Sequence, residues 1–247
     1  MGVAGRVSLS SKPEAWTELA LTLPVFLVYQ LGVVFLRVRN GADIVTARLL
    51  ELSQGDRLTY LELTAGIGLA TVVVFAILGR GQVLRPGKLV QIALEGAAYA
   101  VAMGTTTSWV VGRLFAGPHP GETGGPLSGL VMSLGAGFYE ELAFRVVLFG
   151  FGAKLLLWML LRQRMGLVAG SPPLSAGAVM TMAVWAAASA SVFSAMHYWG
   201  VLGDPFDLRS FVARAVLGLA LTLVYAMRGF AAAVWTHTLY DIWVLVL

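Results

Sequence analysis

The stretch Phe138-Tyr139-Glu140-Glu141-Leu142-Ala143-Phe144-Arg145 places two acids and an arginine inside an otherwise apolar part of the chain. A charged side chain at the centre of a bilayer costs at least about 2.5 kcal/mol, so such residues face the interior of a helix bundle or a wet cavity. The stretch therefore predicts a bundle of membrane helices with a polar site inside it.

The composition points to the same class of protein. Of the 247 residues, 58% are hydrophobic and 12% are charged, whereas a soluble domain is about 25% charged. We expect an all-α, polytopic integral membrane protein with one membrane domain and the lipid bilayer as its main partner. The net charge of +4 is spread over many loops, which argues against a nucleic-acid partner. The absence of cysteine excludes disulfides and thiolate chemistry.

Apolar runs that approach the roughly 20 residues of a membrane-spanning helix predict seven or eight transmembrane helices. These runs cover residues 19–36, 60–79, 89–111, 127–142, 144–161, 174–197, 209–227 and 230–247. The fourth and fifth are expected to be either two helices or one broken helix. The first is too long for the apolar part of a signal peptide.

The segments between the runs have their own patterns. Residues 41–59 combine apolar side chains with charged ones, which predicts a short amphipathic helix at the membrane interface. Residues 112–126, 167–173 and 198–208 are predicted loops. We expect two parts within one domain: N-terminal helices with the interfacial segment (1–126) and a core that carries the chemistry (127–247).

The acidic pair divides its roles by helix geometry. Glu141 and Arg145 are four residues apart and face each other on a helix, so they form a structural ion pair. Glu140 points in another direction and is left free to act as a general base.

Two later runs each place a histidine on a helix face. His197 follows Phe193 by four residues, and Asp241 follows His237 by four. Together with Glu140, they are predicted to converge from three helices around one water and one carbonyl group. A histidine in a membrane helix can also serve only as an interhelical hydrogen-bond donor, and a buried ion pair only as a packing device.

The other polar and aromatic residues have a simpler interpretation. We expect His119 to be a solvated loop residue and Glu95 to be structural or to face a lumen. The tryptophans are expected to be interface or packing residues; they include Trp158, Trp199, Trp235 and Trp243.

Taken together, the three motifs resemble those of the CPBP family of intramembrane proteases, which includes Rce1-like CAAX prenyl endopeptidases and bacterial Abi proteins. The family pattern is Glu-Glu-x-x-x-Arg, then Phe-x-x-x-His, then His-x-x-x-Asn/Asp. This chain matches it with Glu140–Arg145, Phe193–His197 and His237–Asp241. The resemblance covers residues 127–247, and the first 126 residues carry no motif.

The resemblance implies catalytic roles for four residues. Glu140 would activate water, His197 would position that water, and His237 with Asp241 would polarise the carbonyl group. Glu141, Arg145 and Phe193 would support them. The best-studied members have Asn where this chain has Asp241, and a carboxylate cannot donate to an oxyanion unless it is protonated. Asp241 would then orient His237 or accept its proton.

The requirement for a metal is an open alternative. His197, His237, Glu140 and Asp241 offer the residue types of a zinc site, but the chain has no His-Glu-x-x-His helix. We favour water activated by glutamate, without a metal or other cofactor.

The resemblance implies an endopeptidase that cuts near the membrane-associated end of its substrate. The substrate would be a prenylated protein, a bacteriocin precursor or a protein with a C-terminal sorting tail. The expected location is a bacterial inner membrane. The alternative is a non-catalytic membrane protein, either an immunity-type peptide binder or a proton-coupled transporter.

Overall fold

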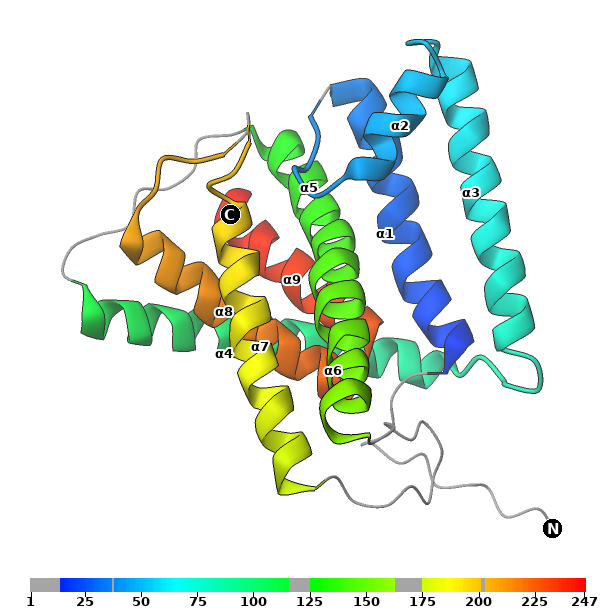
Figure 1. Ribbon diagram of the computed structural model, residues 1–247. Coiled ribbons are helices and arrows are strands. Elements are labelled where there is room, and N and C mark those ends of the chain that lie inside the picture. The colour runs from blue at the N-terminus through cyan, green and yellow to red at the C-terminus, as the bar shows by residue number, and fades with distance from the viewer. Residues whose placement is uncertain (1–13, 37, 116–124, 163–174, 201–202) are drawn as a thin grey trace.

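The computed structural model describes residues 14–36, 38–115, 125–162, 175–200 and 203–247, and every regular element among them is a helix (Figure 1). The helices in chain order are α1 (Ala15–Leu36), α2 (Ile44–Leu52), α3 (Arg57–Leu78), α4 (Pro86–Leu114), α5 (Pro126–Gly135), η1 (Ala136–Phe151), α6 (Gly152–Leu161), α7 (Ala176–Met196), α8 (Leu208–Arg228) and α9 (Phe230–Leu245).

Five helical segments in the described residues are long and apolar enough to cross a membrane. They are α1, α3, the continuous segment Pro126–Leu161, α7 and α8. The predicted spans 89–111 and 230–247 form α4 and α9, which are not among the five. Helix α9 has 16 residues and is about 24 Å long, less than the roughly 30 Å of a bilayer core. The described residues are thus those of an all-helical, multi-pass membrane protein, and the expected number of seven or eight spans is not confirmed.

The runs 127–142 and 144–161 form one 36-residue helix. Pro126 begins it, where a missing N–H costs nothing. Its middle 16 residues, η1, have the wider π-helical geometry, which occurs in proteins mostly as short stretches and often at functional sites. The predicted break at the charged residues is absent, because the backbone stays helical through Glu140, Glu141 and Arg145.

Helix α9 lies at the centre of the bundle and packs against α1, α4, α5, η1 and α8. Residues 231–234 are fully buried, and the alanines among them let neighbouring helices approach closely. Gly229 joins α8 to α9 with a φ of 96°, a conformation that glycine adopts without strain. This turn folds α9 back into the bundle, while α4 runs crosswise to the long helix (Figure 1).

The N-terminal helices α1, α2 and α3 form one side of the molecule (Figure 1). The amphipathic helix predicted within 41–59 is α2, whose first turn is capped by Asp43 through the N–H of Thr46. Asp56 caps α3 in the same way. Its hydrogen bonds with Thr59 hold the pKa of the Asp56 carboxyl below its usual value.

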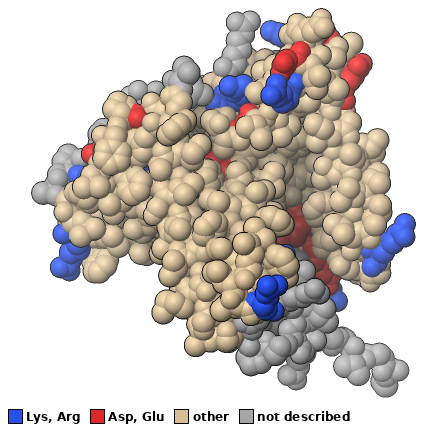
Figure 2. Space-filling model, in the orientation of Figure 1, with Lys and Arg blue, Asp and Glu red and all other residues tan. Residues whose placement is uncertain are grey.

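Large apolar side chains cover the outside of the helices. Figure 2 shows a face that is mostly uncharged, with Lys and Arg at its margins. Phe35, Leu69 and Phe151 are each about two thirds exposed. Apolar exposure on this scale is unusual in water and fits lipid contact. The predicted loop 167–173, most of the loop 112–126 and His119 lie outside the described residues.

Candidate active site

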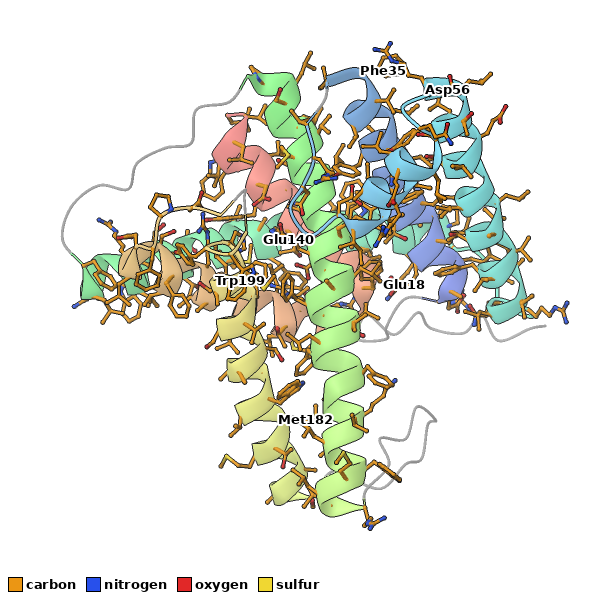
Figure 3. The ribbon with its side chains drawn as sticks, turned by 45° about the horizontal axis from the view of Figure 1, so that its top comes forward. Glu18, Phe35, Asp56, Glu140, Met182 and Trp199 are labelled. Atoms are coloured by element: carbon orange, nitrogen blue, oxygen red, sulfur yellow. The ribbon has the colours of Figure 1, made fainter. Side chains whose placement is uncertain are left out.

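Three helices and one linker bring seven polar residues together in the bundle. Figure 3 labels Glu140 midway along the long helix. We call the following residues the polar cluster: Asn40 from the α1–α2 linker, Glu140, Glu141 and Arg145 from η1, His197 from the end of α7, and His237 and Asp241 from α9.

The two carboxylate oxygens of Glu140 have different surroundings. Its side chain is 10% exposed. Oε1 accepts a hydrogen bond of 2.8 Å from the Asn40 side-chain amide. Oε2 lies 3.9 Å from Nε2 of His197 and has no hydrogen-bond partner among the described residues. One oxygen is therefore held, and the other faces the imidazole.

Glu141 makes contacts with two cluster members through the same oxygen. This oxygen, Oε1, lies 3.2 Å from the Arg145 guanidinium, as the i, i+4 spacing suggests. It also lies 2.7 Å from Nδ1 of His237, 96 residues further along the chain. Glu141 thus also orients His237, a contact that the sequence did not predict.

Phe193 separates the arginine from the two histidines. The Arg145 guanidinium lies 4.2 Å above the Phe193 ring, in the geometry of a cation–π contact. The same ring meets the rings of His197 and His237 edge to face, at centroid distances of 5.0 and 6.2 Å. Phe193 therefore fixes the spacing of three cluster members without any polar atom of its own.

Both ring nitrogens of His237 face carboxylates. Nδ1 is bound to Glu141, and Nε2 lies 3.6 Å from the Asp241 carboxylate. A neutral imidazole donates through only one nitrogen, and an ionised carboxylate only accepts. The arrangement therefore favours a positively charged imidazolium at His237, flanked by two acids.

His197 has a defined tautomer. Its Nδ1 lies 3.0 Å from the carbonyl oxygen of Phe193, which can only accept, so Nδ1 carries the hydrogen and Nε2 of the neutral ring keeps a lone pair. The backbone carbonyl of His197 accepts from the N–H of Asp204 at 2.8 Å, and Asp204 is paired with Arg214 of α8 at 2.6 Å. These contacts hold the end of α7 in place.

Glu140 and His197 thus present two acceptors to the same point. Oε2 and Nε2 are 3.9 Å apart, and neither can donate to the other while Glu140 is ionised and His197 is neutral. A water molecule about 2.8 Å from each atom would give one hydrogen to each of them. The geometry is suited to holding and polarising one water.

The metal alternative would use His197, His237, Glu140 and Asp241. Among the described residues, no group of three or more His, Asp or Glu side chains is arranged to hold a metal ion. A carboxylate on the second ring nitrogen, like Glu141 on Nδ1 of His237, is also the usual partner of a zinc-bound imidazole. The contacts of His237 therefore do not distinguish a metal from water activated by glutamate, and chelation is the test.

Other residues considered from the sequence lie outside the cluster. Glu95 forms two hydrogen bonds of 2.7 and 2.9 Å with Arg228 and so links α4 to the end of α8. Trp235 donates to the Leu21 carbonyl at 3.1 Å. Trp158 and Trp243 are about half exposed on helix surfaces, and Trp199, after the end of α7, is mostly exposed.

Asn40 is the cluster member that sequence reasoning missed. The pair Asn40-Gly41 reads only as a turn signal, and nothing in its spacing relates it to a residue 100 positions away. A buried polar network links the Asn40 linker to α1 and α2, and this network brings the N-terminal part of the chain to the site.

Comparison with known proteins agrees with the motif pattern. The family model described as Type II CAAX prenyl endopeptidase Rce1-like matches residues 123–243. No curated protein and no solved structure matches the chain. The matched residues include η1, α7 and most of α9, and so every cluster member except Asn40. This match supports the resemblance of the chain to the CPBP family and its Rce1-like CAAX prenyl endopeptidases.

Proposed function

We propose that this protein is an intramembrane endopeptidase that uses Glu140 to activate water and hydrolyses a peptide bond near the membrane-associated end of its substrate. The observation that carries the proposal is the pair of acceptors, Glu140 Oε2 and His197 Nε2, which face each other across 3.9 Å in the buried cluster. The family match over residues 123–243 supports the reaction class.

In the first step, Glu140 takes one proton from the bound water while His197 accepts a hydrogen bond from the other. The resulting hydroxide forms a bond to the carbonyl carbon of the substrate, and the carbonyl π electrons move onto its oxygen. Holding the water between two fixed acceptors lowers the entropic part of the barrier.

His237 is placed to stabilise the oxyanion. As an imidazolium it can donate its Nε2–H to the oxyanion, and preorganised donors of this kind are a major source of rate enhancement. Asp241, 3.6 Å from Nε2, and Glu141, 2.7 Å from Nδ1, keep the ring charged and oriented. The donor in this chain is then the histidine, and Asp241 orients it.

The second step returns the proton. The tetrahedral intermediate collapses, the C–N bond breaks, and the leaving amine takes the proton that Glu140 received. Glu140 is again ionised, and the net change is the addition of one water across the peptide bond. The step needs no oxidant or metal ion.

The substrate is proposed to be a membrane-anchored or C-terminal polypeptide segment. The proposed candidates are a prenylated protein, a bacteriocin precursor and a protein with a sorting tail, each of which would be held at the bilayer near the peptide bond to be cut. We place the enzyme in a bacterial inner membrane on the strength of the motif resemblance.

The test compares the polypeptide chain ends of cells that produce the unaltered protein, Glu140→Gln or Glu62→Gln. Glutamine is nearly isosteric with glutamate but is a poor base, so Glu140→Gln should abolish the new chain ends while the protein still folds and inserts. Glu62, on an exposed face of α3, is the matched control and should keep activity. Cleavage in isolated membranes should survive prolonged chelation.

Full cleavage by Glu140→Gln would overturn the mechanism. The absence of any chain end that depends on Glu140 would instead favour the non-catalytic alternative, a peptide binder or a proton-coupled transporter. Loss of activity on chelation, with recovery on added zinc, would reopen the metal alternative.

A further inference from the structure

We propose that Asn40 is a positioning residue for the catalytic carboxylate, and that its hydrogen bond to Oε1 selects Oε2 of Glu140 as the base. The inference rests on the proposed function for its effect on turnover. Its structural part, a fixed donor on one oxygen of Glu140, stands on the contacts of Asn40 alone.

The Asn40 side chain has a defined orientation. Its Oδ1 accepts the N–H of Ala42 at 2.8 Å, and its Nδ2 donates to Glu140 Oε1 at 2.8 Å. A flipped amide would set an oxygen against the carboxylate and an NH2 group against an N–H. Asn40 can therefore meet Glu140 only as a donor, and it does so in a setting where it is 5% exposed.

The backbone of Asn40 is also fixed. Its N–H donates to the Tyr29 hydroxyl of α1 at 2.9 Å, and that hydroxyl donates to the Asp43 carboxylate at 2.8 Å. Asp43 in turn caps α2 through the N–H of Thr46 at 2.8 Å. The Thr46 hydroxyl donates to Gln30 of α1 at 2.9 Å. Residues of this network are buried, so the linker is held from both sides.

A carboxylate has two equivalent oxygens, and rotation about its terminal bond exchanges them. A strong donor on Oε1 removes that freedom and leaves Oε2, the oxygen without a partner among the described residues, facing His197. Because a misplacement of about 1 Å can cost up to roughly 100-fold in rate, fixing the rotation has a direct kinetic consequence. The N-terminal helices thus act on catalysis through one amide.

The kinetic test uses the cleavage found by the chain-end comparison and measures kcat and KM for two variants. Asn40→Ala removes the donor, and we expect kcat to fall about 10- to 100-fold with KM nearly unchanged. Thr46→Val is the matched control, because it also loses one buried hydrogen bond of the same network without touching Asn40 or Glu140. It should lower thermal stability and leave kcat nearly unchanged.

The pH dependence of Asn40→Asp activity distinguishes a positioning role for Asn40 from a purely structural one. The introduced carboxyl group would repel Glu140 when it is ionised, whereas it can donate to Glu140 when it is protonated. The titratable groups near position 40 or near Glu140 are Tyr29 of α1, Asp43 before α2, Glu140 itself and His197 at the end of α7. Arg145 and His237 are the other charged groups of the cluster. The unaltered protein contains the same groups, so their titration affects both proteins alike. The ratio of Asn40→Asp activity to unaltered activity should therefore rise as the pH is lowered.

An infrared experiment tests this inference independently of the proposed function. The infrared difference spectrum between the unaltered protein and Glu140→Gln, recorded in lipid, isolates the Glu140 carboxylate bands and needs no substrate. Removing the donor in Asn40→Ala should shift these bands, and Thr46→Val should leave them in place. Unshifted bands would overturn the inference even if the protein is a protease, and shifted bands without any cleavage would overturn only the proposed function. Equal losses of kcat in Asn40→Ala and Thr46→Val, or a pH-independent activity ratio for Asn40→Asp, would also overturn it.

Discussion

At the scale of single residues, the site depends on one fully buried cation. Arg145 is 1% exposed, and its charge is balanced by Glu141 at 3.2 Å and by the face of the Phe193 ring at 4.2 Å. A buried ion pair adds little net stability when it is intact, but removing one partner costs about 3–5 kcal/mol because the other charge is left without compensation. Arg145 is therefore a stability residue first.

We expect Arg145→Ala to lower both the folded yield and the thermal unfolding midpoint in detergent. Glu141 would keep only His237 as a partner, and the expected loss is about 3–5 kcal/mol. Arg145→Met, which fills similar space without a charge, should be as harmful, and Arg145→Lys should recover part of the loss. A midpoint that does not change in the alanine variant would rule out this structural role.

The contacts that the sequence predicts at this scale are those set by helix periodicity. Glu141 and Arg145, and likewise His237 and Asp241, are four residues apart and meet in the structure. The contact between Glu141 and His237 depends on how η1 packs against α9, and no spacing encodes it. Asn40 was not predicted either, because a turn residue has no periodic pattern that would relate it to a distant helix.

At the scale of helices, a close approach between η1 and α9 brings the acids to the histidine. A Cβ atom at Gly137 would lie 1.9 Å from the Thr238 hydroxyl oxygen and 2.9 Å from the Val234 carbonyl oxygen. The Val234 contact is with backbone, so a rotamer change alone cannot relieve the overlap. The two helices have to separate if position 137 carries any side chain.

Gly137→Ala should therefore lower both stability and activity. We expect a loss of roughly 1–3 kcal/mol from overpacking, with a fall in kcat because Glu140 moves away from its partners. Gly112→Ala is the matched control, because a Cβ at Gly112 of α4 meets nothing within 4 Å and alanine favours helix. Thermal unfolding and cleavage rate measure the two effects, and equal behaviour of the two variants would contradict the packing account.

At the scale of helices, the features that could not be predicted from the sequence are those that depend on which surfaces are buried together. The runs 127–142 and 144–161 are predicted as two helices or one broken helix because charged residues interrupt the apolar pattern. The interruption is a buried site within one helix. The sequence predicts that Glu140 meets the histidines of α7 and α9, but it does not show the contact of Glu141 with α9 or that of Glu140 with the α1–α2 linker. The helix at 44–52 was easier to predict, since an amphipathic pattern and a capping aspartate are local signals.

At the scale of the whole molecule, composition alone predicted a membrane protein, and apolar run length gave the positions of most helices. The number of spans did not follow, because α4 carries Lys88, Glu95 and Arg113 and α9 is short. The division into residues 1–126 and 127–247 remains a prediction, but the Asn40 contact shows that the first part reaches into the polar cluster of the second.

The membrane topology can be tested with single cysteines, because the chain has none of its own. Arg57 and Arg80 lie at opposite ends of α3, a candidate span, and both are exposed. We expect Arg57→Cys and Arg80→Cys to react with a membrane-impermeant thiol reagent from opposite sides of the membrane, and both to react after permeabilisation. Labelling of both from one side would show that α3 does not cross, and the side labelled fixes the orientation of the whole bundle.

The cluster draws its members from the linker at residue 40, from η1, from α7 and from α9, in that order along the chain. A ribosome delivers these pieces one after another, so the site cannot exist until the last of them has joined the others in the bilayer. Under the proposed function, the nascent protein is harmless to its neighbours, and to its own earlier helices, until α9 has been made and has joined the bundle. The arrival of α9 is then itself the event that turns the enzyme on.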